Sequence, residues 1–179
     1  MPMPSLPHDV EIIPLTTHRD ERGWLTEIYR EKWPVGIQPC QWNATASDAN
    51  VLRGVHVHYK HTDYLVLLRG RLSAGLYDAR PKSPTHRMSC VVDIHCDAIS
   101  ALRIPAGVMH GFYCHEPTLY IYGVDSYFDP DDELGCHWAD PGLGLKWPCK
   151  TPKLSERDLQ AGPLAEVEAR LGTLNPEFA

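Results

Sequence analysis

The sequence predicts an all-β fold, a small β-barrel that encloses a polar pocket. Sixteen prolines and thirteen glycines are spread evenly and cut the 179-residue chain into short runs. Many of these runs are apolar, or alternate between apolar and polar side chains, as the strands of a barrel or sandwich do. Three histidines, His56, His58 and His110, lie in or just after turn-flanked runs of this kind and indicate where the pocket is.

Six runs of the sequence are expected to form strands. They are Val51–Val57, Tyr64–Leu68, Leu72–Tyr77, Ser89–Ile94, Ser100–Ile104 and Thr118–Val124. The tripeptide Arg69-Gly70-Arg71 separates two apolar runs and is typical of a hairpin turn. In the last run Tyr120 and Tyr122 alternate with aliphatic residues, so both rings are expected on the same face of the sheet.

Helix signals occur mainly near the C-terminal end. Ser155–Asp158 is typical of a helix start, and Pro163–Leu171 carries apolar residues at helical spacing. Gly172 follows and is expected to end the helix. The prediction is therefore a single domain, residues 1–179, with its core at about residues 10–160 and a short C-terminal helical segment at about residues 155–172.

The charge pattern excludes two classes of partner. The chain has 17 basic and 23 acidic residues, a formal net charge of −6, and no lysine- or arginine-rich tract. Nucleic acid and anionic membranes attract clustered positive charge, so we expect neither as a partner.

The sequence has no long apolar run and no signal-peptide pattern, and its six cysteines form no Cys-x-x-Cys pair. These features predict a cytoplasmic protein with reduced thiols.

Two short motifs predict the pocket. In Arg53–His58 the imidazoles of His56 and His58 stand two residues apart, so on a strand they point to the same side. In Pro105–His110 a proline and a glycine turn the chain just before the imidazole of His110. Three imidazoles gathered inside a small barrel are the general signature of a cupin. Five further histidines carry no motif and are expected at the surface; they are His61, His86, His95, His115 and His137.

Further motifs follow one another along most of the chain. In order they are Asp20-Glu21-Arg22-Gly23 with Glu27, Gln41-Trp42-Asn43, Leu52-Arg53-Gly54-Val55-His56, Asp78-Ala79-Arg80 with Ser83-Pro84-Thr85, Ile104-Pro105-Ala106-Gly107 with His110-Gly111-Phe112, Tyr122, Tyr127-Phe128-Asp129-Pro130, Trp138 with Asp140-Pro141, Trp147-Pro148, and Leu154-Ser155-Glu156-Arg157-Asp158. Over about residues 10–160 the chain therefore resembles the dTDP-4-dehydrorhamnose 3,5-epimerase family, nucleotide-sugar epimerases of the cupin superfamily. One such motif is a weak signal, whereas this many in the family's order favour the family's fold.

This resemblance implies a jelly-roll β-barrel, a homodimer, no metal, and a thymidine-diphosphate-linked 4-keto-6-deoxy sugar as the substrate. The ketone at C4 acidifies the C–H bonds at C3 and C5, so a base can remove a proton and an acid can return one on the opposite ring face. Carried over by motif, His56 is the expected base, Asp158 is the carboxylate that orients it, and Tyr122 is the acid.

The resemblance also implies a set of substrate-binding residues. Arg22 and Arg53 would contact the ligand's oxygens and its diphosphate, because a guanidinium offers two parallel donors to such groups. Glu27, Gln41 and Asn43 would line the path of the nucleotide and the sugar.

The chain departs from the family's pattern at Asp63. The family keeps a lysine near the substrate carbonyl to stabilise the enolate, and counting back from Gly70 places Asp63 at that position. A carboxylate there would repel an enolate, on the order of several kcal/mol in a buried pocket. In a metal-free enzyme Arg53 and His110 would have to hold the enolate instead.

The same residues allow two alternative hypotheses. His56, His58, Asp63 and His110 match the metal set of cupins, and imidazole and carboxylate ligands suit Fe(II), Mn(II), Ni(II) or Zn(II). A divalent transition metal would make the chain a metal-dependent cupin enzyme, a dioxygenase or an isomerase, but a metal-bound His56 could not act as a free base. The last hypothesis is a non-catalytic relative that only binds a sugar nucleotide.

Overall fold

The structure is a computed structural model that describes residues 5–175, so the two ends of the predicted domain, residues 1–4 and 176–179, lie outside the described residues. The strands are β1 (Glu11–Pro14), β2 (Thr17–Asp20), β3 (Gly23–Thr26), β4 (Gln41–Ser47), β5 (Val51–His58), β6 (Asp63–Arg69), β7 (Arg71–Asp78), β8 (Ser89–His95), β9 (Ser100–Ile104), β10 (Val108–Cys114), β11 (Thr118–Val124) and β12 (Glu133–Gly135). The helices are the short 3-10 turns η1 (Pro130–Asp132) and η2 (Pro141–Leu143), and the α-helices α1 (Glu156–Leu159) and α2 (Leu164–Leu174).

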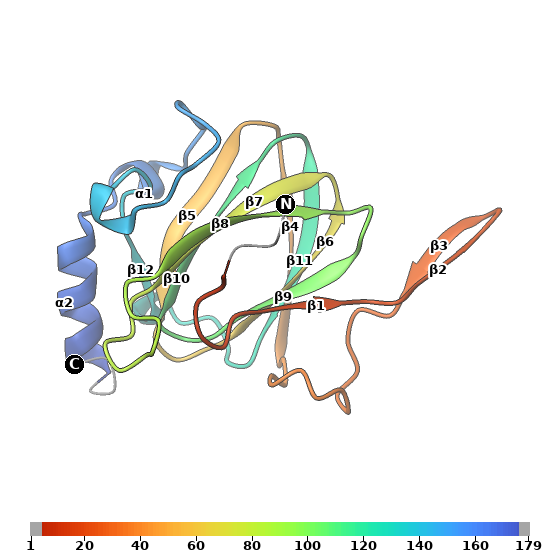
Figure 1. Ribbon diagram of the computed structural model, residues 1–179, viewed down its shortest axis with the longest axis horizontal. Coiled ribbons are helices and arrows are strands. Elements are labelled where there is room, and N and C mark those ends of the chain that lie inside the picture. Colours follow the sequence, from red (N-terminus) through yellow and green to blue (C-terminus); the bar gives the residue numbers. More distant parts are fainter. Residues whose placement is uncertain (1–4, 176–179) are drawn as a thin grey trace.

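The strands form two five-stranded antiparallel sheets that face each other as the walls of a barrel (Figure 1). One sheet has the order β1-β9-β6-β11-β4, and the other has the order β12-β5-β10-β7-β8. The predicted all-β class is confirmed, and each of the six predicted strands is present, as β5, β6, β7, β8, β9 and β11. Each sheet pairs strands that are far apart along the chain, such as β5 with β10 and β4 with β11. Residues distant in sequence therefore meet inside the barrel.

The interior of the barrel is filled by alternate side chains of both sheets. Leu65 and Leu67 of β6 point inward and meet Leu72 and Leu76 of β7 from the facing sheet, together with Phe112 of β10. The intervening residues of β6 point outward, and segments of the N-terminal part cover them. Both faces of β6 are therefore buried, which explains why its sequence is a continuous apolar run and not an alternating one.

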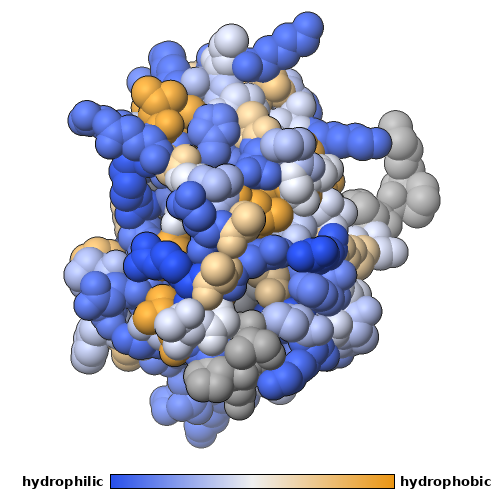
Figure 2. Space-filling model, turned by 90° about the vertical axis from the view of Figure 1, so that its left-hand side faces the viewer, coloured by the Kyte–Doolittle hydropathy of each residue, from blue (hydrophilic) through white to orange (hydrophobic). Residues whose placement is uncertain are grey.

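Helix α2 covers the outer face of the second sheet. Leu164, Val167 and Leu171 are buried against that sheet, in agreement with the predicted helical spacing. Figure 2 looks onto this side of the molecule and shows a mostly hydrophilic surface with scattered hydrophobic side chains. The prediction that Gly172 ends the helix is wrong, because α2 continues to Leu174. A glycine inside a helix costs only about 1 kcal/mol, which the buried apolar stripe outweighs.

The C-terminal segment is interrupted where the sequence predicts continuity. Helix α1 is a single turn capped by the side chain of Ser155, and residues 160–163 separate it from α2. Among the described residues, no helix has the length and apolar character needed to span a membrane.

The hairpin β2–β3 extends away from the barrel (Figure 1). It forms a two-stranded sheet of its own, and the side chains of Trp24 and Leu25 on it are exposed. The sequence does not predict these strands, because Thr17–Thr26 is polar on most positions and lacks a buried face.

Candidate active site

A cavity of about 880 Å³ opens inside the barrel, between the two sheets. Strands of both sheets contribute its walls, and the segments before β12 and around α1 border its mouth. The predicted site residues that line it are Gln41, Asn43, Arg53, His56, His58, Asp63, His110, Tyr122 and Asp158. Nearly all of the sequence-predicted set is therefore brought together in one place.

An imidazole–carboxylate pair lies on one wall. His56 on β5 contacts Asp158 on α1, with 2.6 Å between Nε2 and Oδ1. Asp158 is 4% exposed, and its second oxygen faces the amide of Gly54 at 3.5 Å. Burial raises the pKa of the Asp158 carboxyl, but the hydrogen bonds and charge from His56, with those from Ser155 and Gly54, outweigh it and leave the pKa lowered. The ionised carboxylate therefore assigns the ring proton to Nε2 and leaves Nδ1 as the basic nitrogen.

The backbone at Gly54 allows this pairing. Gly54 has φ +113°, and a Cβ there would lie 2.7 Å from the Cα of Gly111 and from the carbonyl oxygen of His110. A glycine is required because β5 and β10 approach closely at this point. The same approach places His56 directly opposite His110 across the two strands.

Two further charged residues border the imidazole of His56. Arg157 forms a bidentate ion pair with Glu133, at 2.7 and 2.9 Å, and its Nη2 lies 2.8 Å from Nε2 and 3.3 Å from Nδ1 of His56. The Glu133 carboxylate lies 3.5 Å from Nδ1. Neither residue was singled out from the sequence: Arg157 adjoins Asp158 inside a motif, and Glu133 carries no motif at all.

Tyr122 lies on the opposite wall. It belongs to β11 in the first sheet, whereas His56 belongs to β5 in the second, and both line the cavity. Burial raises the pKa of the Tyr122 hydroxyl, and the carboxylates of Asp63 and Glu133 raise it further. The phenol therefore keeps its proton near neutral pH and can act as a donor across the cavity from the base.

Three of the predicted binding residues lie at the cavity wall. Gln41 donates to Asn43, with 3.1 Å between Nε2 and Oδ1, and Gln41 also accepts from the amide of Phe128 at 3.0 Å. Arg53 donates to the hydroxyl of Ser47 at 2.9 Å and to the carbonyl oxygen of Ala46 at 3.4 Å, and its side chain lines the cavity. These groups offer the amide and guanidinium donors that a polar, anionic ligand needs.

Arg22 and Glu27 do not line the cavity of their own chain. Arg22 lies in the turn of the β2–β3 hairpin and pairs with Asp20 at 2.5 Å, and Glu27 pairs with Arg30. A hairpin that extends away from the barrel cannot return to the cavity of the same chain, which is why these two residues stand apart from the rest of the predicted site.

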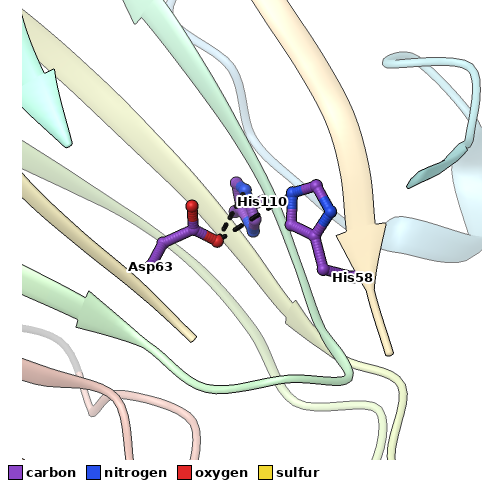
Figure 3. Close-up of side chains that lie close together, drawn as sticks. All are labelled: His58, Asp63 and His110. Carbon is purple, nitrogen blue, oxygen red and sulfur yellow. Dashed lines mark ion pairs between the residues drawn. The ribbon is translucent and has the colours of Figure 1, made fainter. Parts of the chain in front are cut away.

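A cluster of imidazoles and carboxylates lies beside the pair of His56 and Asp158. His58, Asp63 and His110 converge, with Nε2 of His58 at 3.9 Å and Nε2 of His110 at 3.7 Å from Oδ2 of Asp63 (Figure 3). Burial raises the pKa of Asp63 to about 8, with added repulsion from the carboxylates of nearby Asp125, Asp132 and Glu133. Burial also lowers the pKa of His110 to about 4 and lowers the pKa of His58.

The structure brings together three of the four residues in the predicted metal set, namely His58, Asp63 and His110. His56 pairs with Asp158 and is not among the residues whose ligand atoms converge with those of Asp63. His61, predicted at the surface, is instead 10% exposed in its side chain and places Nε2 at 3.9 Å from Oδ2 of Asp63. The prediction for His61 is therefore wrong, because the turn after β5 folds its ring onto that of His58, with 4.0 Å between ring centroids.

Comparisons with known proteins agree with this geometry. The family model described as dTDP-4-dehydrorhamnose 3,5-epimerase matches residues 6–166. A dTDP-4-dehydrorhamnose 3,5-epimerase of Streptomyces griseus is 33% identical over 161 residues, which cover 84% of this chain and 80% of that protein. A dTDP-4-dehydrorhamnose 3-epimerase of Streptomyces niveus is 36% identical over 150 residues, which cover 80% of this chain and 70% of that protein.

A solved structure matches over nearly the whole chain. The dTDP-6-deoxy-D-glucose-3,5-epimerase of Legionella pneumophila, solved in complex with dTDP-4-keto-L-rhamnose, superposes with a TM-score of 0.86 at 28% identity. The match covers 94% of this chain and 95% of that one.

Proposed function

The chain belongs to the dTDP-4-dehydrorhamnose 3,5-epimerase family, and we propose that its cavity epimerises a nucleoside-diphosphate 4-keto-6-deoxy sugar, with thymidine diphosphate as the nucleotide part. The observation that carries this proposal is the placement of His56 with Asp158 on one sheet's wall and Tyr122 on the facing wall. A base and an acid on opposite sides of one cavity are what inversion at a carbon requires.

The chemistry follows from these positions. Nδ1 of His56 removes the proton next to the ketone, and the electron pair of the C–H bond moves into an enolate. Asp158 holds the ring by accepting from Nε2 and stabilises the imidazolium that forms. Tyr122 then returns a proton to the same carbon from the opposite face. Each turnover leaves His56 with an extra proton and Tyr122 without one, so the pair resets through solvent, and solvent hydrogen enters the product.

The nucleotide end of the substrate is assigned to the polar wall. Arg53 supplies a guanidinium for the diphosphate, and Gln41 and Asn43 supply amides beside it. The exposed ring of Phe128 at the cavity's border offers a face on which a pyrimidine base can stack.

We also propose that the protein acts as a homodimer in which the β2–β3 hairpin of one chain reaches the cavity of the other. A two-stranded hairpin is marginally stable alone, and this one carries the exposed apolar side chains of Trp24 and Leu25. A second copy would cover them and deliver Arg22, with Glu27 just beyond the hairpin, to the facing cavity.

The free thiols of all six cysteines support a reducing compartment, the cytoplasm.

The test of the reaction is solvent deuterium exchange into a dTDP-4-keto-6-deoxyhexose, followed by NMR. We expect wild-type protein to introduce deuterium next to the ketone, and His56→Asn to abolish the exchange while the protein stays folded. His86→Asn is the matched control, because that imidazole is exposed and lies outside the cavity. Exchange at an undiminished rate in His56→Asn would disprove the assignment of the base.

The test of the dimer is complementation between two inactive variants. Arg22→Ala and His56→Asn are mixed after unfolding and refolding together. If Arg22 serves the partner's cavity, half of the dimers are hybrids with one intact site each, and about one quarter of the wild-type activity returns. No recovery, or a monomer in sedimentation equilibrium, would contradict the shared site.

A further inference from the structure

The cluster around Asp63 has the geometry of a site for an ion. Three imidazole nitrogens, Nε2 of His58, His61 and His110, lie 3.9, 3.9 and 3.7 Å from one oxygen of Asp63. These separations are too long for hydrogen bonds. For His58, Asp63 and His110, whose ligand atoms all lie within 4.8 Å of one another, they are close to those of donors around a shared transition metal ion, since ligands at about 2.1 Å in a tetrahedral arrangement are about 3.4 Å apart. The side chains would need to close by only a few tenths of an ångström.

The outer nitrogens of two imidazoles are already held. Nδ1 of His110 lies 3.1 Å from the carbonyl oxygen of Val108, and Nδ1 of His61 lies 2.7 Å from the carboxylate of Asp132. Each contact places the ring proton on Nδ1 and turns the lone pair of Nε2 toward Asp63. Metal-binding histidines are typically held in this way, by a carbonyl or carboxylate on the far nitrogen.

The third imidazole, that of His58, also directs Nε2 at Asp63. The side chain of His58 is 13% exposed, and the structure holds its Nε2 toward Asp63. Its Nε2 therefore points at the same carboxylate oxygen as Nε2 of His110, and the two imidazoles and Asp63 present one ligand atom each to a common point.

The charges around the cluster favour a cation. Asp63 is 6% exposed and Asp132 is 1% exposed, and in the described part of the chain the ion pairs of both are with imidazoles alone. Glu133 lies near enough to repel Asp63, but its own charge is already matched by Arg157. A divalent ion beside Asp63 would neutralise the charge of its carboxylate and so favour the ionised form that binds metal.

We propose that His58, Asp63 and His110 bind one divalent transition metal ion at the wall of the cavity. Two imidazoles with one carboxylate suit Zn(II), Fe(II), Mn(II), Co(II) or Ni(II). His56 is not a ligand, because Asp158 holds it, so a metal and a free base occupy the same cavity without competing for one imidazole.

The role of the ion rests on the proposed function. All three ligands line the cavity that holds His56 and Tyr122. A divalent ion at Asp63 would supply positive charge at the position where the family keeps a lysine, and would act as a Lewis acid toward the ketone oxygen as negative charge develops there. The replacement of a lysine by an aspartate would then preserve the sign of the charge at that position.

The test measures binding of the metal itself, apart from activity. Protein is stripped with chelator, dialysed, and titrated with Co(II), whose visible absorption reports imidazole and carboxylate coordination, and the content of Zn, Fe, Mn and Ni after purification is measured by mass spectrometry. We expect one ion per chain and a rise in Tm on binding. Asp63→Asn and His58→Gln should each weaken binding at least about 100-fold, with circular dichroism confirming the fold.

Two variants serve as controls. His56→Asn should bind the ion within about threefold of wild type, and so should His95→Gln, which changes an exposed imidazole on β8. Titration to less than one ion per ten chains would overturn the proposal, as would affinities that Asp63→Asn leaves unchanged, or a site that His56→Asn empties.

The activity assay separates this proposal from the one on which its role rests. Stoichiometric, Asp63-dependent binding in a protein without deuterium exchange keeps the metal site and rejects the epimerase. Exchange that persists in chelator-treated protein, together with failure to bind any ion, keeps the epimerase and rejects the metal site. Exchange that is lost with chelator and returns with one of these ions supports both.

Discussion

Replacement of Asp158 by asparagine tests the central pair of the site. The substitution keeps the size of the side chain and removes its charge. Because Oδ1 accepts from His56 and Oδ2 faces the amide of Gly54, an amide in either orientation leaves one of these two N–H groups without its acceptor. The variant therefore weakens the support of the imidazolium in the transition state while leaving the base itself in place.

The expected magnitude follows from the contact. A hydrogen bond to a charged partner contributes about 1.5–3 kcal/mol, and the 4% exposure of Asp158 means that water does not screen it. Each 1.36 kcal/mol is a factor of ten in rate, so exchange should slow by about 10- to 150-fold. Since the pKa of the Asp158 carboxyl is lowered, the carboxylate is ionised at every pH above about 5, so the charge removed by the substitution is present in wild type throughout the neutral and alkaline range.

The assay is the initial rate of deuterium incorporation at saturating substrate, with Tm measured in parallel. Glu156→Gln is the control, because it makes the same change of a carboxylate to an amide on an exposed position of α1. A rate within twofold of wild type in Asp158→Asn would refute the role of this carboxylate, and a deficit equal to that of Glu156→Gln would do so as well.

Three other variants have distinct expected outcomes. Tyr122→Phe should still exchange the proton that His56 removes but should form the inverted product at least about 100-fold more slowly, as measured by NMR of both epimers; equal losses of exchange and inversion would contradict its role as the opposing acid. Asp78→Asn should lower the free energy of unfolding by about 3 kcal/mol in urea titrations, because the buried carboxylate is bound by the Arg80 guanidinium and by two hydroxyls. Despite burial, these bonds lower the pKa of Asp78 to about 2, so its stabilisation is complete above about pH 4 and is lost as the pH falls toward 2; a variant as stable as wild type at pH 7 would contradict this. Gly54→Ala should lower Tm and exchange together, because its Cβ would meet backbone of β10 at 2.7 Å; an unchanged Tm would show that the strands separate freely.

The strands that could be predicted are those buried on both faces and those in which apolar and polar side chains clearly alternate. Runs such as Tyr64–Leu68 are apolar because both faces of the strand are covered, and this signal survives in the sequence. Strand β10, Val108–Cys114, was missed because its apolar run is broken by His110 and Gly111, which serve the site and the close approach to β5. The hairpin β2–β3 has no covered face in one chain, so no periodicity marks it.

The candidate site was predicted through its motifs, and the exceptions have a physical cause. Glu133 reaches the site through the pairing register of β12 with β5, and His61 reaches it through the turn after β5. No local sequence pattern indicates either placement. Arg22 belongs to a predicted motif but lies outside the cavity of its own chain, and a motif carries no information about which copy of a proposed dimer it would serve.

The placement of His56 and His58 shows why spacing alone could not decide between a base and a metal ligand. Both imidazoles lie on β5, two residues apart, so a sequence pattern treats them as one pair on one face. In the structure each is paired with a different carboxylate from a different element: Asp158 of α1 contacts His56, and Asp63 of β6 faces His58. The proposed choice between a base and a ligand therefore rests on the partners that the fold delivers to each imidazole, and under both proposals a single strand would supply the two functions to one cavity.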